Sequence, residues 1–277
     1  MWPSTPWGTA VHGADSSNVT YPNPFAAAAD QYAEGRPYHH ARTLRRALAG
    51  RRPRTALDVA CGTGLSTRGL AELGIAAVGV DVVPAMVARA RADTALPYAV
   101  AAAEALPLAA GTVELVTVGS GVHWFDQPRF AAEAARVLRP GGALVLYEHV
   151  GPTLPEPAFL DWLRGTYLRR FPSPPRGPLA TEFPAAGVFV PERADRWSDD
   201  VPMTRARFAA YLTTQSNVAA EPPERIRAWF DAELAPFFAG GESRPVRFRA
   251  SHQVLRRGAG APGRAAAAGT AAAARDG

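Results

Sequence analysis

The stretch from Thr55 to Asp81 constrains the fold more than any other part of the chain. A run of β-forming residues, Thr55 to Ala60, leads into a glycine turn at Cys61 to Gly64, and a helical segment then precedes a second β-like run that ends at Asp81. Strand, glycine turn, helix and strand in this order are typical of a parallel α/β unit. Because glycine lets a ligand touch the backbone, the pattern predicts a ligand site where the first strand turns, at the carboxyl edge of the sheet.

The same alternation continues as far as Val150 and predicts the rest of the sheet. A helix is expected over Arg129 to Leu138, because Pro140-Gly141-Gly142 stops a helix and permits a tight return into a strand. We therefore expect a Rossmann-like, doubly wound α/β fold with a mostly parallel sheet of about seven strands, helices on both faces and a helical cap or insertion. The other expected elements are strands over Ile75 to Asp81, Leu96 to Val100, Val113 to Gly119 and Ala143 to Glu148, and helices over Leu65 to Leu73 and Ala85 to Ala92.

Changes in composition predict the organisation of the chain. Residues 1–24 contain prolines and glycines that interrupt regular structure and predict a flexible leader, and residues 258–277, almost only Ala, Gly and Arg, predict a disordered tail. The single domain between them, 25–257, is expected to consist of a segment at 25–54 before the first strand, a ligand-binding core at 55–150 and a part at 151–257 that covers the ligand edge of the sheet. In that last part we expect helices near Phe159 to Arg169, Arg205 to Val218 and Glu224 to Phe238, and a late strand over Val246 to Ala250.

The net charge of +5 is weak evidence for a polyanionic partner. All 30 basic residues are arginine, which is typical of GC-rich coding, and they are scattered instead of forming a stripe interleaved with aromatic residues. We therefore expect no nucleic-acid partner.

Other features of the composition concern the compartment and metals. Cys61 is the single cysteine, which excludes an intramolecular disulfide and fits a reducing compartment. We see neither an export signal nor an apolar stretch of membrane-spanning length, so a cytoplasmic protein without membrane contact is expected. His39 and His40 lack companions at metal-binding spacing, so we expect no metal site.

Two acidic residues indicate the kind of ligand. Asp81 lies where the fingerprint spacing places an acid beside a ribose, whose vicinal hydroxyls can donate to it. A dinucleotide is the natural competitor, but a pyrophosphate loop favours a third glycine at position 67, which is Thr67 here. Asp58, just before the loop, disfavours a pyrophosphate and favours an ammonium group. These residues predict a nucleoside cofactor that carries an amino acid.

Four motifs, taken in order, resemble those of class I methyltransferases of the methyltransferase-11 type. They are Leu57 to Gly64, Val78 to Asp81, Ala103 to Leu108 and Val137 to Gly142. Within that group, Phe25 with Tyr32 to Tyr38, and Gly121 to Asp126, resemble the trans-aconitate methyltransferase-like branch. The resemblance covers residues 25–150 and implies S-adenosyl-L-methionine as the cofactor and S-adenosyl-L-homocysteine as its product.

The resemblance also implies particular cofactor contacts. The glycine loop contacts the methionine portion, the acid matching Asp81 holds the ribose, and the segment matching Ala103-Glu104 flanks the adenine. Many relatives place an aspartate where this chain has Ala102, so the contact to the adenine amino group falls to Glu104 or to backbone. The predicted cofactor-binding residues are Tyr32, Asp58, Ala60, Gly62, Gly64, Asp81, Val82, Ala103, Glu104 and Gly119.

Candidate substrate residues lie before the first strand and at the carboxyl edge of the sheet. The resemblance implies a cap that contains Arg36, which can pair bidentately with a carboxylate of the cofactor or of an acidic substrate, or can be a solvated surface residue. His123, just beyond the strand over Val113 to Gly119, is predicted as a base or a substrate contact, with a purely structural histidine as the alternative. The predicted substrate-binding residues are Arg36, Tyr38, Trp124, Phe125 and His149.

The predicted function is direct in-line transfer of the cofactor's methyl group to a small molecule, as O-methylation of a carboxylate or hydroxyl in specialised metabolism. A carboxylate needs no base, whereas a hydroxyl or carbon acceptor does, and His123 is then the leading candidate. The branch resemblance favours a small carboxylic acid or related metabolite. Two alternatives stay open, a cofactor-binding protein without turnover and a nucleotide-dependent oxidoreductase. The sequence leaves open whether the protein is a monomer or a dimer.

Overall fold

The computed structural model describes residues 29–36, 39–172, 183, 187–218, 222–239 and 243–258. The leader predicted at 1–24, Phe25, Tyr38 and the predicted tail after Gly258 lie outside these ranges. None of the helices in the described ranges has the length and apolar character needed to cross a membrane.

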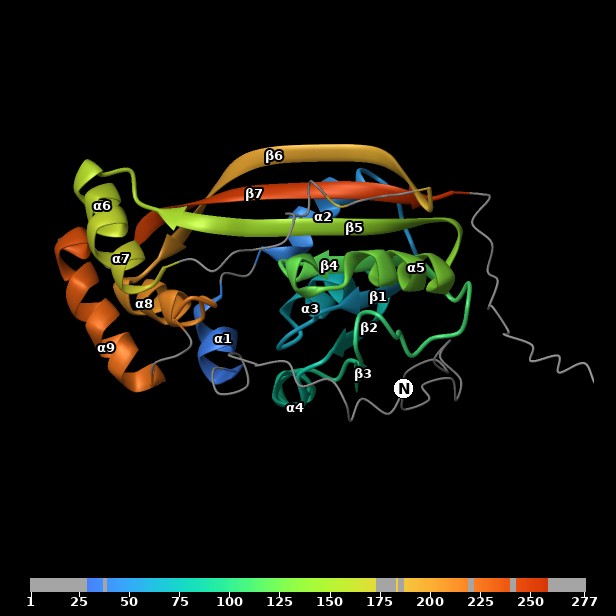
Figure 1. Ribbon diagram of the computed structural model, residues 1–277, viewed down its shortest axis with the longest axis horizontal. Coiled ribbons are helices and arrows are strands. Elements are labelled where there is room, and N and C mark those ends of the chain that lie inside the picture. The colour runs from blue at the N-terminus through green and yellow to red at the C-terminus, as the bar shows by residue number, and fades with distance from the viewer. Residues whose placement is uncertain are drawn as a thin grey trace, which may run out of the picture.

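A seven-stranded sheet forms the centre of the molecule (Figure 1), with the order β3-β2-β1-β4-β5-β7-β6. Strands β1 to β5 run parallel to one another, and β7 is antiparallel to both β5 and β6. The strands are β1 (Thr55–Val59), β2 (Ala76–Asp81), β3 (Tyr98–Val100), β4 (Val113–Gly119), β5 (Leu138–Thr153), β6 (Phe189–Met203) and β7 (Arg244–Arg257). The predicted Rossmann-like α/β fold is confirmed, and the chain reverses direction across the sheet between β1 and β4, where such folds bind ligands.

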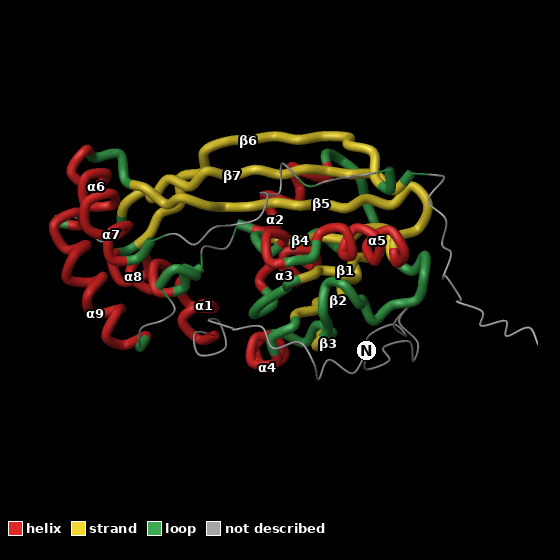
Figure 2. Tube along the Cα trace, in the orientation of Figure 1, coloured by secondary structure: helices red, strands yellow, loops and turns green. Residues whose placement is uncertain are grey.

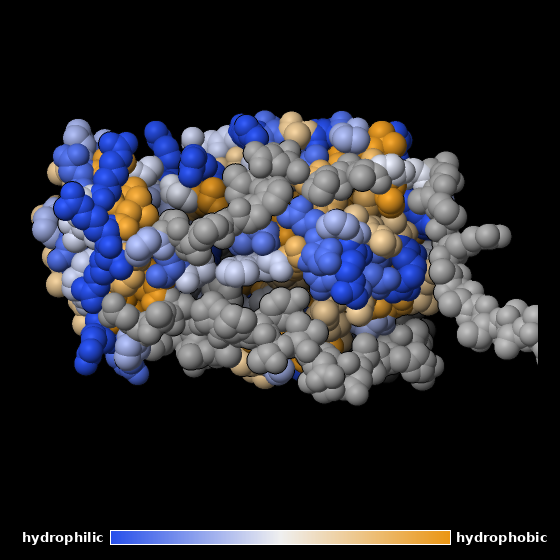
Figure 3. Space-filling model, in the orientation of Figure 1, coloured by the Kyte–Doolittle hydropathy of each residue, from blue (hydrophilic) through white to orange (hydrophobic). Residues whose placement is uncertain are grey.

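Helices cover both faces of the sheet. Leu44 and Leu70 anchor α2 and α3 on one face, and Phe130 anchors α5 on the other. Alternate residues of β1 face opposite sides, so Ala56 lies in the core under α2 and α3, and Leu57 lies in the core under α5. On the face shown in Figure 3, hydrophilic side chains gather over the outer side of α5. These helices are α2 (His40–Leu48), α3 (Leu65–Glu72), α4 (Pro84–Asp93) and α5 (Gln127–Val137).

The last three strands of the sheet form a long ribbon. β5, β6 and β7 contain 16, 15 and 14 residues, whereas β1 to β4 contain at most 7. The ribbon reaches past the parallel strands to a cluster of helices with its own aromatic-rich core (Figures 1 and 2). That cluster contains α6 (Pro157–Trp162), the π-helical turn η3 (Leu163–Tyr167), α7 (Leu168–Arg170), α8 (Arg205–Thr213), α9 (Pro223–Leu234) and the 3-10 turn η5 (Ala235–Phe238).

Helix α1 (Ala29–Gly35) joins this cluster to the parallel part of the sheet, since it contacts both α8 and α4. A Cβ atom added at Gly35 would lie 2.7 Å from backbone atoms of Ala210 and Tyr211, so α1 and α8 approach as closely as two helices can. Glycine at this position is therefore what sets the distance between the two helices.

Three sequence predictions need correction. Strand β6 was not predicted, because Pro191, Pro202 and many charged residues hide its pattern, and such residues are tolerated on an edge strand. Strand β5 begins at Leu138 instead of Ala143, since Pro140-Gly141-Gly142 continues in extended form after the helix, with a positive φ of 74° at Gly141. The helices expected at 159–169 and 205–218 are shorter or interrupted, the first by a π-helical turn.

Candidate functional site

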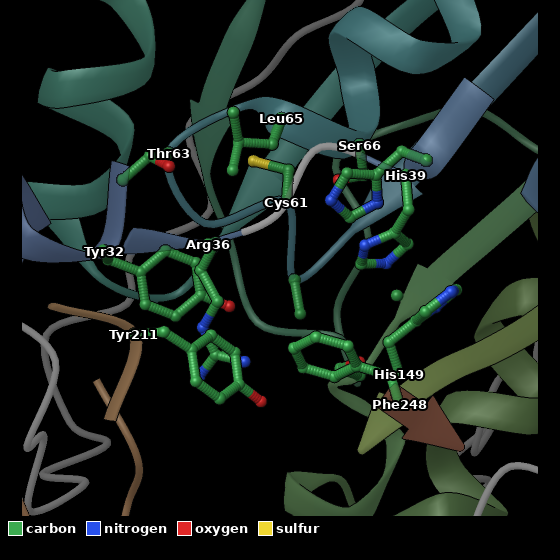
Figure 4. Close-up of a pocket in the computed structure, with 14 residues that line it drawn as sticks. Tyr32, Arg36, His39, Cys61, Thr63, Leu65, Ser66, His149, Tyr211 and Phe248 are labelled. Carbon is green, nitrogen blue, oxygen red and sulfur yellow. The ribbon is translucent and has the colours of Figure 1, made fainter. Parts of the chain in front are cut away.

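A pocket lies at the carboxyl ends of β1 and β4, where the strand order reverses (Figure 4). The glycine loop forms one wall, α1 and α8 form a second, and β5 with β7 forms a third. In Figure 4, Tyr32, Arg36 and Tyr211 lie on the opposite side from His39 and His149. The lining residues are Tyr32, Arg36, His39, His40, Ala60, Cys61, Thr63, Leu65, Ser66, Gly119, Ser120, His149, Tyr211 and Phe248.

The backbone is strained on both sides of the strand reversal. Ala60 follows β1 with φ 55°, and Ser120 follows β4 with φ 57°. Both are residues with a Cβ in the left-handed region, which costs on the order of 1 kcal/mol each. Gly121 permits this approach, because a Cβ there would lie 2.7 Å from Cβ of Ala60. Strain of this kind gathers at functional sites, and here it faces the pocket.

The glycine loop and the cap meet directly. Gly62 and Gly64 have φ values of 55° and 83°, which glycine adopts without cost. A Cβ at Gly62 would lie 3.7 Å from Cε1 of Tyr32, so α1 lies over the loop.

Asp58 lies behind the pocket and does not line it. Its carboxylate is fully buried and accepts hydrogen bonds from the hydroxyls of Ser66, Thr67 and Thr117 at 2.5, 2.7 and 2.9 Å. Burial raises the pKa of Asp58 to about 6, against the opposing effect of these hydroxyls. Asp58 therefore fixes the first turn of α3 by hydrogen bonds, and of its three partners only Ser66 lines the pocket.

Asp81 ends β2 beside the glycine loop. Its Oδ2 accepts from the backbone N–H of Gly62 and its Oδ1 from that of Val83, both at 2.9 Å. A carboxylate has about four acceptor positions, so each oxygen keeps one for a further donor. Burial raises the pKa of Asp81, while these backbone donors lower it. Asp81 can thus hold the loop and a pair of ligand hydroxyls together.

Arg36 is held between aromatic rings. Its guanidinium lies 4.5 Å from the ring centre of Tyr32 and 4.9 Å from that of Tyr211, and Nη2 donates to the carbonyl of Thr214 at 3.0 Å. Cation–π contacts on both faces fix the plane of the guanidinium. Arg36 is therefore an oriented cation in the pocket wall.

Histidines form the opposite wall. The ring centroids of His39 and His149 are 3.4 Å apart, and those of His39 and His40 are 4.5 Å apart. Nδ1 of His40 lies 2.8 Å from the Tyr147 hydroxyl, and Nε2 of His149 lies 3.1 Å from Oδ2 of Asp199. Burial, reinforced by His149, lowers the pKa of His40 to about 3. His40 is therefore neutral near pH 7.

Of the predicted site residues, Tyr32, Arg36, Ala60, Gly119 and His149 line the pocket. Gly62 and Gly64 lie in the glycine loop, and Asp81 ends β2 and accepts a hydrogen bond from Gly62. Val82 follows β2, and Ala103 and Glu104 follow β3. Ala103 is buried, and Glu104 accepts from the backbone N–H of Asp126 at 2.8 Å.

The segment 123–125 lies outside the pocket lining. His123, in the 3-10 turn η2 (Val122–Trp124), has Nδ1 3.9 Å from Oε1 of Glu148. Trp124 is 46% exposed, and the ring of Phe125 packs against Phe130 at 4.8 Å. The roles predicted for these three residues stay predictions.

The sequence analysis missed several pocket residues. His39 and His40 were considered only as metal ligands, although two histidines before a helix of the cap were a usable signal. Tyr211 and Phe248 have no local signal, because α8 and the ribbon bring them from the far end of the chain. The same holds for Asp199, which contacts His149 but does not line the pocket.

Comparison with known proteins identifies the family. A family model described as a methyltransferase domain matches residues 57–146. A protein of Anaeromyxobacter dehalogenans, whose solved structure is described as that of a type II methyltransferase, is 30% identical. The match covers 78% of this chain and 95% of that one, with a TM-score of 0.58. The chain belongs to the class I S-adenosylmethionine-dependent methyltransferases.

Curated relatives match this methyltransferase over part of its length. An uncharacterized methyltransferase of Mycobacterium tuberculosis is 41% identical over 125 residues, 44% of this chain and 50% of that protein. The malonyl-[acyl-carrier protein] O-methyltransferase of Hahella chejuensis is 40% identical over 99 residues, 34% of this chain and 36% of that protein. The methyltransferase thus spans about half the length, or less, of these two relatives.

Proposed function

We propose that the protein transfers the methyl group of S-adenosyl-L-methionine to an oxygen atom of a small molecule, a carboxylate or a hydroxyl, by direct in-line transfer. The observation that supports this most is the pocket, which joins the glycine loop to the ends of β4 and β5 and is closed by side chains of α1 and α8. Holding two reactants in line and away from water is most of what such a transfer needs.

The residues at the glycine loop fit the cofactor. Gly62 and Gly64 have the left-handed backbone that allows a ligand to approach the loop closely. Asp81 keeps one acceptor position on each carboxylate oxygen, which suits two vicinal ribose hydroxyls. We assign the adenine to the edge at Ala103 and Glu104. When bound, the cofactor supplies an electrophilic methyl group, and the chain supplies its orientation.

The acceptor side is formed by the cap and the ribbon. Arg36, oriented by Tyr32 and Tyr211, offers a guanidinium that pairs with a carboxylate of the cofactor or of the acceptor. Phe248 and Tyr211 provide apolar surface beside it. A small acid or a related metabolite fits this combination, and the named O-methyltransferase relative from Hahella chejuensis also favours an oxygen acceptor.

Calorimetry on the full chain tests the cofactor. We expect S-adenosyl-L-homocysteine to bind and NAD not to bind. Tight binding of NAD with no response to S-adenosyl-L-homocysteine would overturn the proposal in favour of an oxidoreductase.

Turnover is tested separately with methyl-labelled S-adenosyl-L-methionine and a metabolite extract of the source cells. We expect a labelled small molecule detected by mass spectrometry. Cofactor binding with no labelled product would instead support a binding protein without turnover.

A further inference from the structure

A chain of three side chains, two of them buried and the outermost largely exposed, ends in the pocket and takes no part in the proposed cofactor site. His149 belongs to β5, Asp199 to β6 and Arg42 to α2. Nε2 of His149 lies 3.1 Å from Oδ2 of Asp199, and Nη2 of Arg42 donates to both carboxylate oxygens of Asp199. His149 is 3% exposed and Asp199 is 6% exposed, so the pair is shielded from water although His149 lines the pocket.

The ring of His149 is fixed in one orientation. The His39 ring lies against it with centroids 3.4 Å apart, and Trp197 meets it edge-on at 6.0 Å. Ala250 of β7 pairs with His149 on one side and with Trp197 on the other, and its single methyl group leaves room for Asp199 to reach His149 across β7. A fixed ring presents one defined nitrogen to a reactant.

Asp199 determines which nitrogen of His149 is basic. Paired with Arg42, its carboxylate only accepts hydrogen bonds, so Nε2 of His149 carries the hydrogen and Nδ1 carries the lone pair. Nδ1 is buried and has no hydrogen-bond partner among the described residues. Burial lowers the pKa of His149 to about 4, against the opposing effect of Asp199, so the ring is neutral near pH 7 and able to accept a proton.

We propose that His149 is the general base that takes the proton from a hydroxyl group of the acceptor, and that Asp199, fixed by Arg42, is its positioning residue. This inference rests on the proposed function and narrows the acceptor to a hydroxyl compound, because an ionised carboxylate needs no base.

The transfer conserves atoms and charge. The bond between the methyl carbon and the sulfonium sulfur breaks, its electron pair stays on sulfur, and the carbon bonds to the acceptor oxygen. The hydroxyl proton moves to Nδ1 of His149. The carboxylate of Asp199 balances the charge of the resulting imidazolium until the proton leaves to solvent.

His123, the base expected from the sequence, is less well placed. It does not line the pocket, and its carboxylate neighbour Glu148 lies on the opposite face of β5 from His149, since adjacent strand residues alternate. The two histidines therefore make competing predictions that variants can separate.

The first test distinguishes a methyl ether from a methyl ester. The full chain is incubated with methyl-labelled S-adenosyl-L-methionine and a metabolite extract of the source cells, and the labelled product is treated with alkali, which cleaves esters and leaves ethers intact. We expect an alkali-stable product. His149→Gln should lower the rate of its formation about 100- to 10,000-fold, and Asp199→Asn at least about tenfold. His252→Gln replaces another buried histidine of the ribbon, outside the pocket, and should keep the wild-type rate.

A second readout needs no turnover. Imidazole ¹⁵N chemical shifts of the full chain with S-adenosyl-L-homocysteine should show His149 with hydrogen on Nε2 near pH 7. In Asp199→Asn the side-chain amide can turn its NH₂ group toward Nε2, so the hydrogen should move to Nδ1. A purely structural histidine would not couple this tautomer to the rate of transfer.

Each contrary result has a definite meaning. The role of His149 is overturned if the labelled product is an ester, or if folded His149→Gln makes the ether at the wild-type rate. It is also overturned if His123→Gln loses more activity than His149→Gln, or if the wild-type ring of His149 carries its hydrogen on Nδ1. Cofactor binding without any labelled product also overturns it, while leaving the cofactor site intact. Absence of S-adenosyl-L-homocysteine binding overturns the proposed function itself.

Discussion

The two sides of the pocket are built in different ways. On the glycine-loop side, two of the three hydroxyls that satisfy the charge of Asp58 come from Ser66 and Thr67, eight and nine residues further along the chain, and the third comes from Thr117 on the neighbouring β4. On the ribbon side, Arg42 and Asp199 are 157 residues apart. One side is a local motif, and the other is an assembly that exists only once the sheet is complete.

The difference teaches where each property of the protein resides. Under the proposed function, the backbone geometry of the local side would serve any acceptor, whereas the charged, histidine and aromatic groups of the assembled side would discriminate between acceptors. Changes on the two sides should therefore separate in experiment, and the following predictions run from the largest expected effect to the smallest.

Replacing Asp81 by alanine should affect the cofactor alone. We expect S-adenosyl-L-homocysteine to bind about 10 to 100 times more weakly, a loss of about 1 to 3 kcal/mol, because hydrogen bonds to a carboxylate are lost. Calorimetry measures the affinity, and Asp93→Ala, an exposed aspartate paired with Arg89, is the matched control. Unchanged affinity in folded Asp81→Ala would refute the ribose assignment.

Replacing Gly35 by alanine should loosen the cap. The added Cβ would press on the backbone of α8, so we expect unfolding by urea to show a loss of about 2 kcal/mol and Tyr32 and Arg36 to bind ligands less well. Gly165→Ala is the control, since nothing lies within 4 Å of a Cβ there, and it should lose no stability. Equal stability of the two variants would show that α1 is free to shift.

Acidification should change the stability contributed by the two sides of the pocket in opposite directions. The folded-state pKa of His149, about 4, is below its ordinary value. Its contribution to the free energy of unfolding is therefore present above pH 6.5 and is lost as pH falls, by about 2 kcal/mol at pH 5. The folded-state pKa of Asp58, about 6, is above its ordinary value. Its contribution is therefore lost as pH rises through 6 and regained, by about 1 to 2 kcal/mol, between pH 7 and pH 5.

Urea unfolding at pH 7 and pH 5 checks both signs. Compared with wild type, His149→Gln should lose less stability on acidification, and Asp58→Asn should lose more. The same pH response in both variants would contradict the assignment of these charges.

Replacing Ala60 by glycine should release the strain beside the pocket. We expect about 1 kcal/mol of added stability with little change in cofactor affinity. Ala49→Gly, at φ 46° and far from the pocket, should gain a similar amount, and Ala88→Gly in α4 should lose about 1 kcal/mol. If Ala60→Gly alone fails to gain, the left-handed conformation is not costly at that position.

The same contrast explains what the sequence could predict. The order of strand, turn, helix and strand from Thr55 to Asp81 depends on residues that are close together in the sequence. The parallel sheet, the glycine loop and Asp81 could therefore be predicted from the sequence alone. β6 could not, because an edge strand with Pro191 and Pro202 lacks an apolar alternation. His149 was expected at the site, but its partner Asp199 was not, since only the pairing of β6 with β7 brings it near.

Helix α2 and the segment after it carry a row of arginines whose ion pairs depend on the ionic strength of the medium. Arg42, Arg46 and Arg51 pair with Asp199, Asp195 and Glu192 along β6, and the arginine side chains are 63%, 50% and 39% exposed. Dissolved salt screens exposed charges over about 8 Å at physiological strength. The electrostatic attraction between α2 and β6 should therefore weaken as the salt concentration rises, while the hydrogen bonds from the hydroxyls to buried Asp58 should not change. Under the proposed function, we expect raised ionic strength to change the rate of methyl transfer more than the affinity for S-adenosyl-L-homocysteine.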